Sequence, residues 1–425
     1  MGSISYFQKM NKAFIILFIF IAQIVYGQNN NKGTQGQDVY KKSAVMKSVK
    51  ASMKVENYSK ALNELNNAIA KYDKAKQDAE YYYLQVKNLE QLALQENKNM
   101  YLATRPDTTK YFTYLYNMYQ QALICDSIEQ IPDLNGKTEF KYRYDNAETL
   151  LKYRQNLKVS TNFFYKKKDY KNAYRYVDLY CSTKNNAIFT NKKGELTFPE
   201  EKDNKSMAVM AVLSAYGSEN NKGVVKYLDE AMQDAALKYK LLELGCKSYF
   251  ALGDTAKAVE KLKTGYAQHA EQEYFFMSLV KYYNDTDNHT ACLDLAKDMV
   301  KKFPQKRNYW FIKAKEEEML DKCDDAIDSH MKAIALQADD AESYSSIGAL
   351  YTSKAQKLYR NNTLSVTNPG YKEVKAQLKK LYQNAKAAYE SAKKYAPNDR
   401  SLWYDGLRNA YFKLNMGKEL KELEN

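Results

Sequence analysis

A fixed interval separates four small side chains in the middle of this chain. Val224, Ala258, Cys292 and Ala326 each follow the previous one by that same interval. The interval is about 34 residues, the length of one helix-turn-helix unit in a repeat protein. It therefore predicts a stack of helical hairpins that binds something, and it argues against an enzyme.

Other positions repeat in the same register. Large side chains align in one column, and small side chains align four positions later in a second column. The first column holds Leu242, Phe276, Trp310 and Tyr344, with Ala208 as its weak member, and the second holds Val212, Cys246, Val280, Ala314 and Gly348. Spacings of three and four place side chains on one helix face. Small residues facing large ones let two antiparallel helices interdigitate. The register predicts five uninterrupted units beginning near Lys205, Tyr239, Glu273, Arg307 and Ala341.

These positions resemble those of the tetratricopeptide repeat. The clearest matches are Tyr344-Ser-Ser-Ile-Gly-Ala-Leu-Tyr351 and the stretch from Ala385 to Pro397, with Tyr58 to Ala68 as a good second helix near the start. The resemblance implies an all-α, right-handed α-solenoid of helix-turn-helix repeats. Only 6 prolines and 15 glycines in 425 residues fit such a chain better than one rich in sheet and turns.

The expected organisation follows from where the register holds and where it slips. The intervals from Ala173 to Val224 and from Ala326 to Ala385 are both longer than one repeat, so we expect insertions there. The insertions are expected to protrude from the array on a binding side. The layout is a signal peptide (1–27), a flexible mature N-terminus (28–41), irregular repeats (42–204), a regular array (205–399) with an insertion near 355–380, and C-terminal capping helices (400–425).

The first 27 residues have the layout of a secretory signal. Lys9 and Lys12 precede an apolar run that begins at Ala13, and the small residue Gly27 stands before Gln28. The run is shorter than the roughly 20 apolar residues that span a bilayer, so we expect cleavage and not a retained anchor. Export to the periplasm or outer membrane is the expected localisation. The Lys-, Asn- and Tyr-rich composition and the Tyr-Gly ending of this segment resemble exported proteins of the Bacteroidetes.

The positive charge does not point to nucleic acid. The formal net charge of +14 includes Lys9 and Lys12, and the only basic block is Lys166-Lys167-Lys168. Such an excess can mark nucleic-acid binding, but no nucleic-acid-binding motif accompanies it. A solvated basic surface is the plain interpretation. Acidic polysaccharide, anionic lipid headgroups with peripheral membrane association, or an acidic protein are the alternatives.

No arrangement of reactive residues predicts catalysis, a cofactor or a metal. The five cysteines are odd in number and widely spaced, and His269, His289 and His330 share no zinc-ligand spacing. His330 falls in a packing position. The run from Glu316 to Glu318 is interpreted as spread around a helix surface, where it cannot converge as a catalytic pair.

Binding is therefore expected on the first helices, which line the concave face in the tetratricopeptide family. One column there is basic, a neighbouring column is partly apolar, and an aromatic ring lies one turn before Met277. These candidate groove residues are Lys247, Lys281, Lys315, Tyr274, Met277 and Phe311. Together they could hold an extended acidic segment, although aligned lysines also arise by chance in a lysine-rich chain.

Two functions from different classes stay open. The first is a non-enzymatic scaffold or adaptor that binds a protein segment, in an envelope assembly or secretion complex. The second is a carbohydrate-binding accessory protein of a glycan-uptake system. Against the second stand the lack of a lipid-anchor cysteine after the apolar run and the presence of only two tryptophans.

Overall fold

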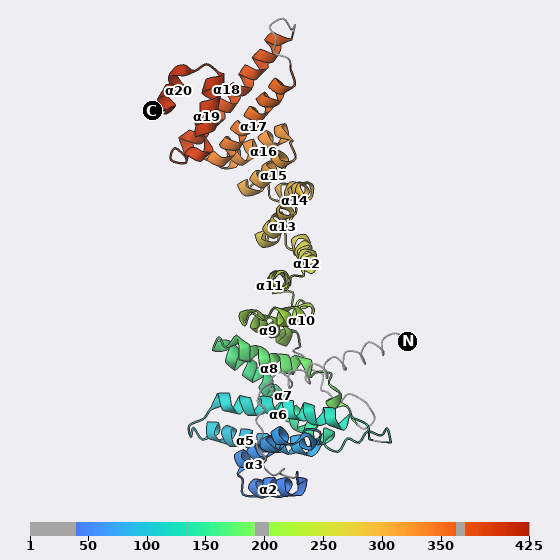
Figure 1. The fold of residues 1–425 in the computed structure, drawn as a ribbon. Helices are drawn as coiled ribbons and strands as arrows, with labels where there is room; N and C mark the ends of the chain where they lie inside the picture. Colours follow the sequence, from blue (N-terminus) through green and yellow to red (C-terminus); the bar gives the residue numbers. More distant parts are fainter. Residues whose placement is uncertain (1–39, 134, 192–203, 363–369, 425) are drawn as a thin grey trace, which may run out of the picture. The chain divides into compact units, whose positions relative to one another are not determined.

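The computed structural model describes residues 40–133, 135–191, 204–362 and 370–424 as an array of helices (Figure 1). Contacts divide the chain into two compact units, residues 1–146 and 147–425. The predicted signal segment and almost all of the predicted flexible N-terminus lie outside the described residues. Within the described ranges, no helix has the length and apolar character needed to cross a membrane.

The first unit is built from antiparallel pairs of consecutive helices. Its helices are α2 (Lys42–Lys54), α3 (Tyr58–Lys71), α4 (Asp73–Lys76), α5 (Ala79–Tyr101) and α6 (Thr108–Glu129). α2 contacts α3, and α5 runs along α6. The tyrosines that cluster in this part of the sequence serve packing, since Tyr81, Tyr82 and Tyr119 are buried.

The second unit continues the series of hairpins. α7 (Arg143–Lys166) begins at the end of the first unit, and α8 (Tyr170–Ser182) and the short η1 (Ala187–Phe189) follow. The central helices are α9 (Asn204–Gly217), α10 (Asn221–Ala231), α11 (Lys238–Ala251), α12 (Thr255–Gln268), α13 (Glu273–Asp285), α14 (His289–Lys302), α15 (Arg307–Met319) and α16 (Cys323–Leu336). The last helices are α17 (Ala341–Arg360), α18 (Tyr371–Tyr395), η2 (Arg400–Leu402), α19 (Tyr404–Lys413) and α20 (Gly417–Glu424).

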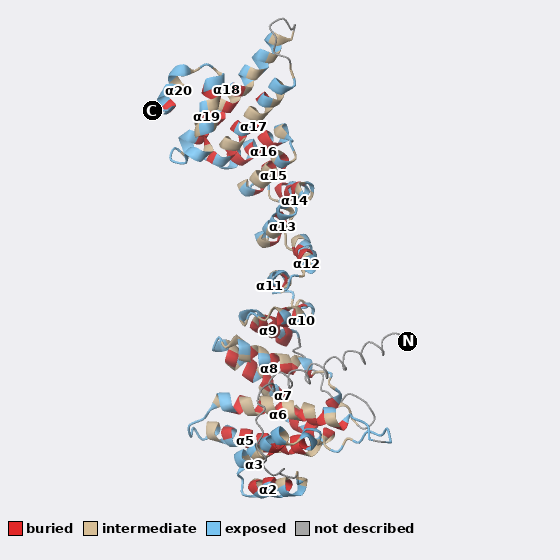
Figure 2. Cartoon of the chain, in the orientation of Figure 1, coloured by how far each residue is buried: buried red, intermediate tan, exposed pale blue. Residues whose placement is uncertain are grey.

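The repeat register determines these helices and their packing. The first helices α9, α11, α13, α15 and α17 each begin within one residue of the predicted unit starts. Val224, Ala258, Cys292 and Ala326 have no exposed surface. Buried residues lie between the paired helices, whereas the outward faces are exposed (Figure 2). The predicted fold class, an all-α solenoid of tetratricopeptide-like helix-turn-helix repeats, is confirmed.

The turn inside each central hairpin repeats as well. Glu219, Gly253, Asp287 and Asp321 are separated by the same repeat interval, and all adopt a left-handed backbone with φ between 52° and 77°. The next residue is the N-cap of the second helix. Asn220, Asp254 and Asn288 each accept a hydrogen bond from the backbone N–H three residues on, at 3.0 to 3.2 Å. Lys322 occupies the fourth N-cap and provides no such side-chain bond.

The extra residues before Ala385 lengthen two helices. α17 has 20 residues and α18 has 25, compared with 13 or 14 in each helix from α13 to α16. α17 and α18 contact each other as a long hairpin (Figure 1). Residues 363–369, which join α17 to α18 in the sequence, lie outside the described residues.

Candidate functional site

The predicted lysines lie on three consecutive first helices, and each has a carboxylate beside it. Lys247 Nζ lies 2.5 Å from Glu243 Oε1 on α11, and Lys281 Nζ lies 2.8 Å from Asp285 Oδ2 on α13. On α15, Lys315 Nζ lies 2.5 Å from Glu318 Oε2. The column is therefore a row of ion pairs, not a bare row of cations.

Lys247 also contacts the next repeat. Its Nζ lies 5.1 Å from the ring centroid of Tyr274 on α13, within cation–π range. The hydrogen bond and charge of Glu243 raise the pKa of Lys247, with a smaller contribution from Tyr216 on α9. Burial raises the pKa of Tyr274 to about 12. Side chains from two consecutive units thus meet around one ammonium group.

Apolar side chains remain accessible on the same helices. Met277 is 42% exposed, and Tyr216 and Phe250 are each 38% exposed. Phe250 lies three residues after Lys247 and therefore on the same side of α11. The sequence reasoning missed Tyr216 and Phe250, although their separation by one repeat interval was a signal that could have found them. We call the accessible set the first-helix strip: Tyr216, Lys247, Phe250, Tyr274, Met277, Lys281, Phe311 and Lys315.

Phe311 has a different environment from Met277. The guanidinium of Arg307 lies 4.3 Å from the centroid of the Phe311 ring, and His330 packs edge-on at 5.5 Å. The Phe311 ring is half-buried, and it lies in contact with the Arg307 guanidinium and the His330 imidazole. The structure thus brings Lys247 together with Tyr274, and Phe311 together with Arg307. Among the described residues, Lys281 pairs only with Asp285.

A hydrogen-bonded network lies behind Phe311. His330 Nε2 is 2.7 Å from Glu318 Oε1, and His330 Nδ1 is 3.1 Å from Ser343 Oγ. The Ser343 hydroxyl donates to Asp340 Oδ2 at 2.7 Å, and Arg307 Nε donates to the same oxygen at 2.6 Å. The single hydroxyl proton goes to Asp340 and an ionised carboxylate only accepts. His330 thereby links Glu318 of α15 to Ser343 of α17.

This serine–histidine–carboxylate arrangement is structural. Ser343 and His330 have no exposed surface. A catalytic serine must be reached by a substrate and must pass its proton to the histidine, whereas the Ser343 proton points to Asp340. Burial would raise the pKa of Asp340, but hydrogen bonds from Arg307 and Ser343 outweigh it and hold the pKa below its usual value.

The three consecutive glutamates of α15 are not spread over its surface, as the sequence interpretation held. Glu316 and Glu317 are 3% and 2% exposed. Glu316 Oε2 lies 2.9 Å from His289 Nδ1, and Glu317 accepts hydrogen bonds from Lys313 and Ser329, both at 2.6 Å. Each glutamate faces a different partner because consecutive helix positions diverge, so they bury charge between hairpins without converging.

The acidic, histidine and cysteine side chains of the described ranges are the candidates for a metal or disulfide site. No group of three or more His, Cys, Asp or Glu side chains there is arranged to hold a metal ion. All five cysteines are free, and burial raises the pKa of each thiol, to about 12 for Cys125, Cys181, Cys246 and Cys292. The buried Cys125, Cys246 and Cys292 act as packing residues.

Comparison with known proteins gives partial structural overlaps. No protein-family model matches the sequence, and no curated protein sequence matches it. The crystal structure of MamA is 21% identical over 42% of this chain and 86% of MamA, with a TM-score of 0.31. The C-terminal part of a TPR repeat-containing protein from Cytophaga hutchinsonii is 12% identical over 58% of this chain and 98% of that one, with a TM-score of 0.34. MamA from Desulfovibrio magneticus RS-1 is 11% identical over 44% and 98%, with a TM-score of 0.29.

The fold of this chain rests on its own helix register. First helices that begin at a regular interval, and buried small residues at the same interval, define a tetratricopeptide-like helical-repeat fold.

Proposed function

We propose that this protein is a non-catalytic scaffold that binds an extended segment of another protein along the first-helix strip. Its organisation follows the expected layout, with removal of residues 1–27 and export to the periplasm or outer membrane. The carrying observation is the contact of Lys247 with Tyr274 across two repeats, beside the accessible Met277 and Phe250. Apolar side chains next to held charges suit a peptide that carries both kinds of group.

The ion pairs sharpen which partner the strip fits. Because Glu243, Asp285 and Glu318 stand beside the three lysines, the strip presents both signs of charge. A purely acidic segment would meet these carboxylates as well as the lysines. A segment with mixed charges around an apolar anchor is the better complement, since exposed Met277 and Phe250 can bury their remaining surface against it.

Paired substitutions on the strip and elsewhere test this function. Phe250→Ser combined with Met277→Ser removes the apolar contacts, and Lys247→Gln, Lys281→Gln and Lys315→Gln together remove the cations. Both variants should retain about tenfold less partner in pull-downs from envelope extracts, because the anchor or its flanking charges are lost. Partners are identified by mass spectrometry against wild-type protein.

Matched control substitutions lie on second helices. Met331 and Leu336 on α16 are 54% and 38% exposed. The apolar control variant replaces both with Ser. Three lysines on second helices are also exposed: Lys263, Lys297 and Lys332. The charge control variant replaces all three with Gln. Both controls should capture the partner as wild type does. Equal capture by strip and control variants contradicts the proposal, as does binding of a glycan when no protein is retained.

A further inference from the structure

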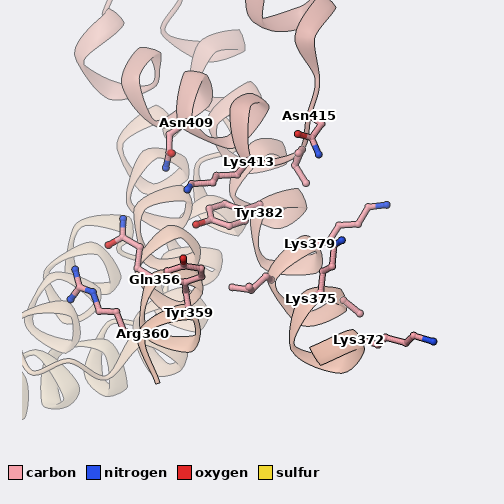
Figure 3. Close-up of a pocket in the computed structure, with 13 residues that line it drawn as sticks. Gln356, Tyr359, Arg360, Lys372, Lys375, Lys379, Tyr382, Asn409, Lys413 and Asn415 are labelled. Atoms are coloured by element: carbon pink, nitrogen blue, oxygen red, sulfur yellow. The ribbon is translucent and has the colours of Figure 1, made fainter. Parts of the chain in front are cut away.

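An open cleft lies between the long α17–α18 hairpin and the end of α19, apart from the first-helix strip (Figure 3). Its volume is about 870 Å³. Tyr382, which is 8% exposed, and Tyr359, which is 60% exposed, lie near its centre. We call its cationic side chains the basic cleft: Arg360, Lys372, Lys375, Lys379 and Lys413.

The charges of the basic cleft are unbalanced. No carboxylate lines it, and among the described residues none of its five cations forms an ion pair. Other lysines on α17 differ, since Lys354 pairs with Asp324 and Lys357 pairs with Asp321. The cleft thus gathers five cations and no carboxylate, and an anionic occupant is the complement.

The position of the lysines on α18 adds to this excess. α18 begins at Tyr371, so Lys372 and Lys375 lie in its first turns, where the helix dipole already presents positive charge. Glu373 in the same first turn offsets part of this positive charge, although it does not line the cleft. A bound anion would interact with the lysines and with the positive end of the helix together.

The spacing fits an extended chain better than a single ion. Lys372, Lys375 and Lys379 follow one another along α18 (Figure 3), and seven residues of helix rise about 10 Å. Neighbouring lysines differ by roughly 4.5 and 6 Å in rise. Extended peptide advances about 3.3 Å per residue, so carboxylates one to two residues apart match them. Gln356 and Asn409 also line the cleft, and their amides can donate to and accept from peptide groups.

We infer that the basic cleft is a second binding site, which takes an extended acidic segment of a partner protein. The site does not depend on the first-helix strip. Its sequence signal is the spacing of three and four residues between Lys372, Lys375 and Lys379, inside a stretch where the repeat register slips. The spacing along α18 does not indicate Arg360 and Lys413. These two residues line the cleft because α17 and α19 fold against α18.

The test uses the full protein and a dye-labelled hexaglutamate peptide followed by fluorescence anisotropy. Substituting Lys372→Gln, Lys375→Gln and Lys379→Gln together should weaken binding by about tenfold, because three exposed charge contacts are lost. The Lys263, Lys297 and Lys332 charge control should bind within about twofold of wild type. Raising the salt from about 0.05 M to about 0.3 M should weaken wild-type binding, because these cations are solvent-exposed. Hydrogen exchange should slow at the first turns of α18 when the peptide is added.

Distinct outcomes would overturn the inference. Equal binding by the cleft and control variants, with unchanged helicity, removes the site. Competition by hexaglutamine as strong as by hexaglutamate removes the charge argument. Tighter binding of a heparin fragment or oligothymidylate, lost in the cleft variant, replaces the acidic peptide with another polyanion. The strip variants should keep hexaglutamate binding, so failure here is distinguishable from failure of the proposed function.

Discussion

At the scale of single residues, a buried carboxylate in the second unit accepts hydrogen bonds from several donors. Asp340, which is 3% exposed, accepts from Arg307, from the Ser343 hydroxyl and from the Ser343 backbone N–H at 3.1 Å. It thereby caps α17 and joins α15 to α17. A buried carboxylate with three donors stays ionised, and removing any donor leaves a charge without compensation.

The Asp340 network predicts a defined acid sensitivity. Burial would raise the pKa values of Asp340 and Glu318, but hydrogen bonds from Arg307 and from His330 outweigh it and hold them below 3.8 and 4.5. Their stabilisation is therefore complete above these ordinary values and is lost as the pH falls through the lower folded values. Asp340→Asn should lower the free energy of unfolding by about 2–3 kcal/mol at pH 7 and flatten its decline below pH ~4. Urea unfolding at a series of pH values measures both effects, and an unchanged acid slope contradicts the account.

At the scale of elements, each central hairpin combines a left-handed residue with a helix N-cap. Asn220, Asp254 and Asn288 satisfy a backbone N–H that the helix itself leaves unbonded. At the same position α16 has Lys322, which provides no side-chain cap. The N-terminus of α16 is therefore less well capped than those of α10, α12 and α14.

Repairing that cap should stabilise the array. Lys322→Asn is expected to raise the free energy of unfolding by about 1 kcal/mol, since the new amide oxygen can accept from the N–H of Asp325. Lys332→Asn, at an exposed position inside α16, is the matched control and should destabilise slightly through lower helix propensity. Thermal unfolding of both variants measures the difference, and equal melting temperatures would contradict the capping argument.

The elements also show which features the sequence could predict. Side chains that recur at the repeat interval predicted the first-helix starts and the buried small column, because local periodicity decides which helix face packs. The Glu316 to Glu318 run was misjudged, since its burial depends on His289 of the preceding hairpin and on Ser329 of α16. The carboxylates beside Lys247 and Lys281 were visible at a spacing of four, yet only the folded helices show that they pair.

At the scale of the whole molecule, the two proposed binding surfaces fall on a regular and an irregular part of the array. The first-helix strip belongs to the regular array, where neighbouring units supply adjacent side chains. The basic cleft belongs to the lengthened α17–α18 hairpin, where the register slips. A scaffold with two chemically different surfaces can hold two segments of one partner, or segments of two partners, and linked sites gain affinity from each other.

The proposed export predicts a mature chain that lacks residues 1–27. We expect the protein recovered from a periplasmic or envelope fraction to begin at Gln28, because the basic residues, apolar run and Gly27 before it match a cleavable signal. Intact-mass measurement with N-terminal peptide mapping checks this. Replacing Ile15 and Ile16 with Asp should keep the chain in the cytoplasm with residues 1–27 attached. Recovery of the full-length chain from the envelope would contradict cleavage.

The sequence alone determined the repeat length, the all-α class, the buried small column and the position of the first-helix lysines, because these follow from local periodicity. Only the tertiary structure decided the charge environment that different helices create for one another. It buried Glu316 and Glu317 between hairpins, and it placed Arg360 and Lys413 in one cleft with lysines of α18. These arrangements depend on distances between side chains from different helices, and the order of residues along one helix does not contain them.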